Sequence, residues 1–406
     1  MSVDSAGRTE PRVRPEPCAD VVAPLAEALA PLAEAFALLA ELGRVAWVPD
    51  RPAAAPVPPP DVQFDLTPHV PPSRLIDGIR IRFGPVHTVF ATAVLERTPT
   101  REDQQRLADA LATVEAAYPW RPGGLFLHVA YGLPYFRRLP RGLFDLYVPR
   151  RLADTRRFVL AEAQPATADT RVLVETNELL LTLRSDVPDH LADVLAWFTG
   201  SDRLAGYPVD SPRLPVRFTS GRVAFTQPGL PAALAVRHGL RYAERLNPRS
   251  PTWMGLLDNQ PEPGTTAPAV TFRRAATTAQ AGDYFDEGAV QHLAHTLLDL
   301  PAFYEDAGFT ERVRCLFRDV PVPRAPGAVP LHERIDGPGL DAMDVPGGAV
   351  APKLHFAVFV PDADHFVALR RDHPPADLER FLTATRRQNF LVPPRRHRAF
   401  PLLELA

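Results

Sequence analysis

The sequence predicts an α+β protein made of two similar halves, with a helical arm in front of them. The chain has 406 residues, which is enough for two domains or for one large duplicated one. Segments with strand periodicity and segments with helix periodicity alternate along it, and this succession occurs twice. Two such sets indicate two units that each have a sheet with helices on one face. An Ala- and Leu-rich heptad pattern lies in front of both sets and predicts the arm.

The predicted arm, residues 1–60, contains a seven-residue repeat between positions 23 and 42. The repeat places apolar residues on one stripe of a helix, namely Leu25, Leu29, Leu32, Phe36 and Leu39. We expect Pro31 to kink this helix, Gly43 to end it, and the Pro-rich residues 49–60 to form a stiff linker. The helix either docks on its own domain or forms a dimer contact, because three heptads with an internal proline are too few for an independent coiled coil.

We expect the first half at 61–235 and the second half at 236–406. In the first half, periodicity predicts strands at 79–95, 125–132 and 216–225, a hairpin or long strand at 172–183, and helices at 101–118, opening at Thr100, and at 187–198. In the second half, it predicts strands at 269–274, 289–297 and 353–360, and helices near 301–315 and at 376–387.

Composition and missing motifs exclude several classes of function. The net charge of -3 gives no footprint for nucleic acid, and no apolar run reaches the roughly 18 residues that span a membrane. The N-terminus lacks an export signal, and two cysteines, Cys18 and Cys315, cannot build a disulfide framework, so we expect a cytoplasmic protein. Phosphate-loop, nucleophile-elbow, zinc-protease and Cys-x-x-Cys motifs are absent. We interpret the single lysine, Lys353, as the result of a coding bias.

Two short motifs contain residues that can carry chemistry. Met254-Gly255-Leu256-Leu257-Asp258-Asn259 puts a carboxylate shortly after a glycine in an apolar run. Leu331-His332-Glu333-Arg334 puts a His-x-Arg tripeptide in a Pro- and Gly-rich loop. A buried carboxylate and a buried imidazole, on opposite faces of the iron, are the two side chains that a haem peroxidase needs.

With their order and surroundings, these motifs resemble those of the dye-decolorizing peroxidase family. Further segments resemble the family in the same order over roughly residues 61–406: Asp61-Val62-Gln63, Val129-Ala130-Tyr131-Gly132-Leu133-Pro134-Tyr135-Phe136, Pro361-Asp362-Ala363-Asp364-His365-Phe366 and Phe390-Leu391-Val392-Pro393-Pro394. The sequence departs from the family pattern at two places. Asn259 replaces the second glycine of the family's Gly-x-x-Asp-Gly signature, and residues 341–350 lack the arginine that the family carries on the distal side.

The resemblance implies two ferredoxin-like halves of the dimeric α+β barrel type, with haem b in the second half. His332 would be the proximal iron ligand, and Asp362 would accept a hydrogen bond from its other ring nitrogen. Arg334 would pair with a haem propionate. The signature residues Gly255 and Asn259 would lie against the cofactor.

Asp258 would be the distal acid-base, which takes a proton from hydrogen peroxide and returns it to the leaving oxygen. The implied partners are a small-molecule substrate and hydrogen peroxide or dioxygen, and a homo-oligomer is open. The missing arginine puts efficient peroxidase turnover in doubt while leaving haem binding intact.

Each of these residues also has a structural interpretation. His332 can be an ordinary surface histidine, Arg334 can belong to a surface salt bridge, and Asp258 can form an Asx-turn with Asn259. His292 and His295 are three residues apart, so on a strand they lie on opposite faces and do not share a metal, whereas on a helix they can share a face. One of the two histidines can instead point into the haem pocket.

A basic tetrad, Arg395-Arg396-His397-Arg398, follows the last matching segment. It is either a solvated face or a site for an anionic group, and its arginines are the first candidates to replace the missing distal charge. The preferred function is a haem-dependent, peroxidase-like oxidoreductase. The alternatives are a specialised non-peroxidase haem enzyme that acts on a small molecule in biosynthesis, and a degenerate haem-free binding scaffold.

Overall fold

The computed structural model describes residues 29–51, 57–69, 74–76, 79–81, 84–140, 142–164, 171–255, 266–316, 333–334, 337–372 and 378–406. Every structural statement below concerns these residues. None of the helices within these ranges is long and apolar enough to cross a membrane.

The first half is one antiparallel sheet with the connections of a ferredoxin-like unit. Its main elements are β3 (His87–Leu95), α3 (Arg101–Ala117), β4 (Phe126–Gly132), β6 (Leu179–Ser185), α6 (Pro188–Phe198) and β9 (Val216–Phe225). The strand order is β9-β3-β6-β4, with each helix connecting two of these strands. The predicted strands and helices of this half are confirmed, except that the stretch at 172–183 is neither a hairpin nor one long strand: Leu173–Val174 and Leu179–Ser185 pair with different strands. The stretch at 79–95 contains two separate strands.

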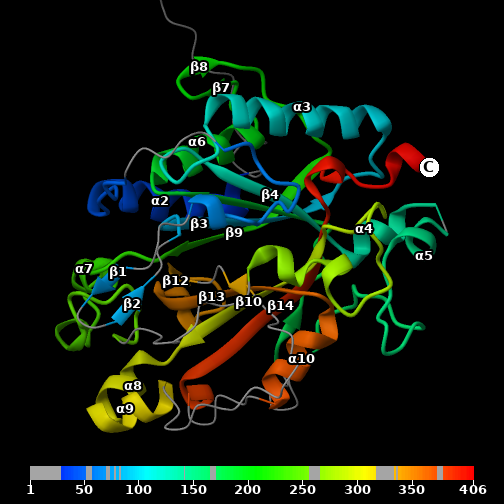
Figure 1. Cartoon of the computed structure of the whole chain (residues 1–406). Coiled ribbons are helices and arrows are strands. Elements are labelled where there is room, and N and C mark those ends of the chain that lie inside the picture. The colour runs from blue at the N-terminus through cyan, green and yellow to red at the C-terminus, as the bar shows by residue number, and fades with distance from the viewer. Residues whose placement is uncertain are drawn as a thin grey trace, which may run out of the picture.

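The second half repeats this order. Its main elements are β10 (Ala289–Leu298), α8 (Leu300–Glu305), α9 (Phe309–Leu316), β12 (Gly337–Asp341), β13 (Ala351–Val360), α10 (Ala363–Asp372) and β14 (Leu382–Val392). The strand order β14-β10-β13-β12 is again that of a ferredoxin-like unit. In Figure 1 this half, with α8, α9 and α10, lies below the half that carries α3 and α6. The predicted tandem of ferredoxin-like halves is therefore confirmed.

Shorter elements join these units. They are α4 (Leu133–Arg138), α5 (Leu143–Tyr147), α7 (Leu230–Arg237), β1 (Arg74–Ile76), β2 (Ile79–Ile81), β5 (Leu173–Val174), β7 (Arg203–Leu204), β8 (Tyr207–Pro208) and β11 (Glu333–Arg334). Single 3-10 turns are η2 (Thr67–His69), η3 (Ala243–Arg245), η6 (Pro346–Gly348), η7 (Leu378–Phe381), η8 (Arg395–His397) and η9 (Leu403–Leu405).

Two short junctions connect the sheets into a closed ring of eight described strands. At one junction Phe390 and Leu391 of β14 pair with Gly132 and Tyr131 of β4. At the other, β12 meets β9. The ring encloses a buried apolar interior to which both halves contribute, for example through the stacked rings of Phe64 and Phe359, 4.1 Å apart. Ring closure leaves the main strands no free edge.

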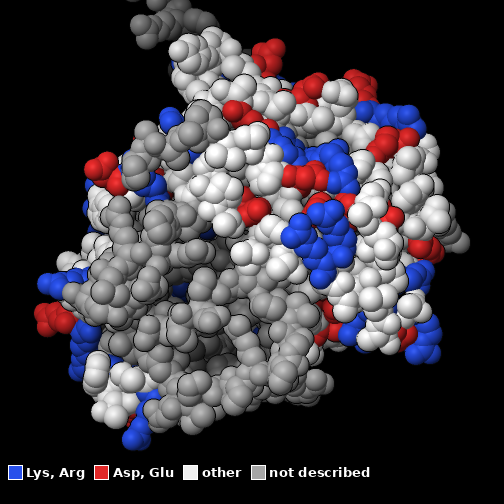
Figure 2. Space-filling view, in the orientation of Figure 1, with Lys and Arg blue, Asp and Glu red and all other residues white. Residues whose placement is uncertain are grey.

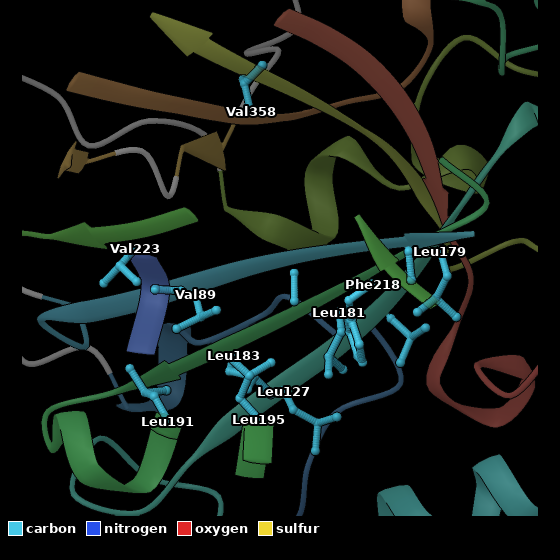
Figure 3. Packing of buried hydrophobic residues seen from close by; sticks show 14 of the residues in the cluster. Val89, Leu127, Leu179, Leu181, Leu183, Leu191, Leu195, Phe218, Val223 and Val358 are labelled. Carbon is cyan, nitrogen blue, oxygen red and sulfur yellow. The ribbon is translucent and has the colours of Figure 1, made fainter. Parts of the chain in front are cut away.

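The outer face of the first sheet packs against its helices. Figure 3 shows Val89, Leu127, Leu181 and Leu183 of the sheet beside residues of α6 such as Leu191. Alternate residues of each strand therefore serve two different cores, one under the helices and one inside the ring.

Segments that resemble the peroxidase family, although far apart in sequence, meet at the β4–β14 junction. The buried side chain of Gln63 donates to the carbonyl oxygens of Val129, at 3.2 Å, and Pro393, at 2.7 Å. Its own carbonyl oxygen accepts from the Val129 amide, at 3.1 Å. One glutamine therefore ties the start of the first half to strands of both halves.

The arm docks on its own domain, as one of the two alternatives predicted. A 3-10 turn, η1 (Ala30–Leu32), leads into α2 (Ala33–Val45), which packs on α6 and β9. A Cβ at Gly221 would lie 2.8 Å from Ala35, so glycine permits this close approach. The expectation that Gly43 ends the helix is wrong, because α2 continues to Val45. The N-terminal part of the predicted stripe lies outside the described residues.

Two predictions in the second half are wrong. Residues 267–274 form the 3-10 turns η4 (Ala267–Val270) and η5 (Phe272–Arg274), because the Phe272 amide bonds to the Gly288 carbonyl in a loop and not to a strand. The helix predicted at 376–387 is wrong as well: residues 378–381 form a 3-10 turn, and the residues from 382 on belong to β14. Pairing of β14 with β10 along its whole length outweighs local helix propensity. The helix of this region is α10, which begins directly after Asp362.

The capping box at the start of α3 allows a test of how much this cap stabilises the first half. The Thr100 amide donates to Asp103 at 2.8 Å, and the Asp103 amide donates to the Thr100 hydroxyl at 3.3 Å. Thr100→Ala should lower the free energy of unfolding by about 1 kcal/mol, because it leaves an amide of the first turn without its side-chain acceptor. Thr113→Ala, in the middle of the same helix, is the matched control and should cause no loss. Urea titration of both variants checks this, and equal stabilities would contradict the role of the cap.

Candidate functional site

The sheet of the second half has two faces that carry different polar groups. One face is covered by α10, and the other lines the interior of the ring. His292 and His295 of β10 lie on opposite faces, as the strand interpretation of their spacing predicted.

The face toward α10 carries a buried imidazole in a defined orientation. The His292 ring stacks on Phe366 of α10, with centroids 3.7 Å apart and planes 20° apart. Its Nδ1 lies 2.7 Å from the Asn389 side-chain oxygen, and the Asn389 amide donates to the Ala161 carbonyl at 3.0 Å. The histidine and the asparagine are opposite each other in the β10–β14 register. Stacking and hydrogen bonding together fix the position of this ring.

A guanidinium group lies on the same face. Arg387 is two residues from Asn389 on β14, opposite Ala294 of β10, and is 3% exposed. This sheet face therefore carries a buried imidazole that stacks on α10 and, two residues further along β14 from its partner Asn389, a buried guanidinium. Sequence analysis did not single out Arg387 or Asn389, because it assigned part of this region to a helix.

Asp362 lies where β13 passes into α10. Its Oδ1 accepts from the amides of Asp364, at 3.0 Å, and His365, at 3.1 Å, so it caps the helix. Arg151 lies 3.5 Å from the same oxygen. Among the described residues, these three contacts all fall on Oδ1, so Oδ2 is the oxygen with room for a further donor. Glu333 of β11 pairs with Phe359, three residues before Asp362.

Gly255 adopts a left-handed conformation, with φ of 73°. A Cβ at this position would lie 2.9 Å from the Tyr304 hydroxyl, which donates to the Trp253 carbonyl at 2.8 Å. The Trp253 indole in turn donates to the Gly339 carbonyl of β12, at 2.9 Å. The segment that leads toward Asp258 is therefore held against α8 and β12, and it requires glycine at 255.

Several predicted site residues cannot be placed. Asp258, Asn259 and His332 lie outside the described residues, and Arg334 is described only by its backbone, which pairs with Val358 of β13. Their assigned roles stay predictions.

The arginines of the basic tetrad form ion pairs at the junction between the halves. Arg395 and Arg398 pair with Glu115 of α3, and Arg396 pairs with Asp61 and Asp286. Figure 2 shows basic and acidic side chains interleaved on the face it displays. These arginines lie at the junction, whereas Arg387 lies on the sheet face that also carries His292.

A cavity of about 760 Å³ lies beside α4 and α5. It is lined by both aromatic and charged residues, including Phe136, Phe144, Phe158, Arg137 and Glu162. Ala161, whose carbonyl accepts from Asn389, also lines it. The cavity therefore approaches the residues that hold His292.

The interior face carries a second group of polar side chains. Asp341, at the end of β12, lies 3.3 Å from His295 Nε2 and 3.4 Å from His355 Nε2. Lys353 Nζ lies 3.6 Å from the same carboxylate and donates to the Met343 carbonyl at 3.0 Å. All four residues are buried. One feature of the sequence could have pointed to this cluster, because the only lysine of the chain lies in it.

Burial and the carboxylate set the charge states of this cluster. Burial lowers the pKa of His355 to about 4, so its imidazole is neutral at pH 7. Burial also raises the pKa of Asp341, but the polar contacts with His295 and His355 outweigh it and hold this pKa well below its usual range. Burial lowers the pKa of Lys353, and Asp341 opposes that shift.

Comparisons with known proteins agree with the geometry at the level of the fold. Residues 85–324 match the model of a family described as "Family of unknown function (DUF7405)". This match covers 240 of the 406 residues (324 − 85 + 1). The chain belongs to this family. Among curated proteins, no match to the chain is found.

Solved structures of dye-decolorizing peroxidases share the fold of this DUF7405 member. The encapsulated DyP-type peroxidase from Mycobacterium smegmatis is 14% identical, with a TM-score of 0.51, and the match covers 82% of this chain and 97% of that one. A DypB variant from Rhodococcus jostii RHA1 in complex with haem is 16% identical, with a TM-score of 0.51 and coverages of 80% and 95%. A dye-decolorizing protein from V. cholerae is 14% identical, with a TM-score of 0.50 and coverages of 80% and 96%. The DUF7405 chain is thus a divergent protein with the haem-peroxidase-like fold.

His128 provides a pH test of the ring interior. Its Nε2 lies 3.0 Å from the Gln291 side-chain oxygen, across the interior from β4 to β10. Burial lowers the pKa of His128 to about 4, while the hydrogen bond to Gln291 opposes the shift. The unfolded chain takes up a proton near pH 6.5 and the folded chain does not, so stability falls as pH drops from about 6.5 to about 4.

This group can contribute up to about 1.4 kcal/mol per pH unit within that window. His128→Gln keeps a donor for Gln291 but does not titrate, so its free energy of unfolding should fall less steeply over the same range. Urea denaturation at several pH values measures both slopes. Parallel curves for the two proteins would show that His128 is not held neutral.

Proposed function

We propose that this chain is a haem-binding oxidoreductase of the dye-decolorizing peroxidase type, with haem b in its second half. The observation that carries the proposal is the buried set of His292, Arg387 and aromatic rings on the sheet face covered by α10. Imidazole, guanidinium and aromatic groups are what haem proteins use to bind iron, propionates and the macrocycle, so the chemistry of this donor set fits the group. The fold shared with peroxidases supports the same half as the location.

His332 is the proposed iron ligand. The described chain resumes at Glu333, which pairs with β13 close to Asp362. That proximity supports Asp362 as the acceptor for the second imidazole nitrogen, through the oxygen that does not cap α10. Such an acceptor fixes the tautomer and the orientation of the ring and raises its basicity. Arg334 would hold a propionate, because a guanidinium matches a carboxylate in a bidentate pair.

Asp258 is the proposed acid-base. Its carboxylate would take a proton from hydrogen peroxide and return it to the leaving oxygen. The anchoring of Gly255 against α8 and β12 supports this role, because a general base must be held within hydrogen-bond reach of the proton it moves. When bound, haem would supply the redox chemistry, by which two electrons pass from the substrate to hydrogen peroxide.

Arg387 is the proposed source of positive charge on this face. Residues 341–350 contain no arginine, and Arg387 is a buried guanidinium on the sheet face that also carries His292. A preorganised charge near a breaking bond contributes about 2.7–4 kcal/mol in comparable sites. Arg387 lies on β14 and not in residues 341–350, so it would favour a substrate orientation different from the one that an arginine in residues 341–350 would favour.

A second candidate is a specialised non-peroxidase haem enzyme that acts on a small molecule. The specific observation in its favour is the missing arginine together with the cavity of about 760 Å³ next to Ala161. Rapid turnover of a small molecule with slow oxidation of a standard dye would support this candidate. A purified chain without a Soret band, even after haem addition, would instead favour a haem-free binding scaffold.

His332→Ala tests the iron ligand. The variant should lose the Soret band or show that of loosely bound haem, because it lacks the proposed imidazole. The absorption spectrum of the purified variant, compared with that of the exposed-histidine control His238→Ala, makes the measurement. A normal histidine-ligated spectrum in His332→Ala would assign the ligand to another residue, with His292 the next candidate.

Asp258→Asn tests the acid-base. This variant should bind haem normally and react with hydrogen peroxide about a hundred- to ten-thousand-fold more slowly, the range typical of general acid-base groups. Stopped-flow spectroscopy gives the rate, and Asp283→Asn, in a surface loop of the same half, is the matched control. An unchanged rate with intact haem would return Asp258 to a turn-forming role.

A further inference from the structure

The cluster on the interior face of the ring has the geometry of a metal site. The imidazole nitrogens of His295 and His355 and a carboxylate oxygen of Asp341 all lie within 4.8 Å of one another. His295 Nε2 lies 3.3 Å from one carboxylate oxygen of Asp341, and His355 Nε2 lies 3.4 Å from the other, so the carboxylate lies between the two imidazoles.

The surroundings of His295 orient its Nε2 toward the carboxylate. Its Nδ1 lies 2.9 Å from the Thr385 hydroxyl, which itself lies in donor position 3.4 Å from the His295 carbonyl. The hydroxyl oxygen therefore accepts from Nδ1–H, and the lone pair of Nε2 faces Asp341. Asp344, 3.6 Å from Nδ1 and paired with Arg386, adds the carboxylate that often supports a metal-binding histidine.

His355 gives an independent indication. Its side chain is fully buried, and neither ring nitrogen has a hydrogen-bond partner among the described residues. A buried polar group without a partner is costly and requires an explanation, such as an ion. Gly339 makes room for this ring, since a Cβ there would lie 2.2 Å from His355 Nε2. Because Gly339 has no side chain, His355 Nε2 can point past it toward Asp341.

We propose that His295, His355 and Asp341 bind one divalent transition-metal ion inside the ring, with Zn²⁺ the best match to the ligand set. Imidazole nitrogen and carboxylate oxygen are the ligands that Zn²⁺ and its first-row neighbours take in proteins. Three protein ligands leave a position for water or a small anion. Asp344 and Arg386 are partly exposed and mark the side from which an ion enters.

Lys353 and a bound metal ion would compete for the Asp341 carboxylate. Its ammonium lies 3.6 Å from Asp341 and neutralises the carboxylate when no ion is bound. An ion on Asp341 would repel this cation, so binding requires the flexible Lys353 side chain to move away from the carboxylate. Metal affinity should therefore rise when Lys353 is replaced by an uncharged side chain of similar length.

This site is independent of the proposed haem. His295 and His355 lie on the interior face of the second sheet, whereas His292 and Asp362 lie on the side of α10. Loss of haem in His332→Ala should leave metal binding intact. Failure of either proposal can therefore be recognised while the other stands.

The test uses the full chain, freed of metal by a chelator and dialysed against Zn²⁺, with the bound metal measured by elemental analysis. We expect one Zn²⁺ per chain and a rise in the melting temperature on Zn²⁺ addition, since a ligand that binds the folded state stabilises it. His355→Gln and Asp341→Asn should each weaken binding about a hundredfold or more. Lys353→Met should strengthen it about tenfold, and His238→Ala, at an exposed histidine, should change nothing.

Two results would overturn the proposal. One is a wild-type chain that retains no stoichiometric Zn²⁺ and shows no thermal shift, which needs no variant to interpret. The other is a Zn²⁺ affinity that His355→Gln and Asp341→Asn leave unchanged in chains whose circular dichroism matches wild type. A variant that fails to fold is replaced by Lys353→Met, for which an unchanged or weaker Zn²⁺ affinity also counts against the site.

Discussion

Closure of two sheets into one ring is the constraint on which the rest of this structure depends. Each half alone would expose strand edges and the apolar side chains that now meet inside the ring. The junctions that close it are short, two residue pairs between β14 and β4 and one between β12 and β9. Gln63 and the ion pairs of the basic tetrad reinforce the first junction from outside the strands. Gln63, near the start of the first half, and the basic tetrad, near the C-terminus, therefore help to hold the two halves together.

Closure also gives every strand of the second half two separate chemical environments. Because successive side chains point to opposite faces, β10 sends His292 toward α10 and His295 into the ring. The outer environment has aromatic rings and Arg387, which suit a large planar cofactor. The interior environment has a carboxylate, two imidazoles and one ammonium, which suit a small ion. A single sheet can in this way serve two sites that do not share residues.

The polar groups of the interior are costly in a space that is otherwise apolar. Asp341 remains ionised there because His295, His355 and Lys353 surround it, and burial keeps His128 and His355 neutral. A buried charge that loses its partners destabilises a fold strongly, whereas an apolar replacement of the whole set is often tolerated. Function is a physical reason to retain such a set, and it motivates the search for a bound metal ion.

The sequence by itself determined the class of the fold and most elements of the first half. Strand and helix periodicity predicted β4, β9, α3 with its cap at Thr100, and α6, because these elements have one buried face and clear end signals. The resemblance pointed to tandem ferredoxin-like halves, and the solved structures bear this out. Local signals failed at β14, where pairing with β10 overrides helix propensity, and at 267–274, where loop hydrogen bonds replace a strand.

Only the tertiary structure decided which side chains share a site. His295, Asp341 and His355 belong to three strands, and their meeting depends on sheet register, which one sequence does not specify. The same holds for His292, Asn389 and Arg387 on the opposite face. Motif spacing could nominate His332 and Asp258, whose roles stay predictions. It could not show that the only lysine of the chain is a buried partner of Asp341, because burial is a property of the packed sheets and not of local sequence.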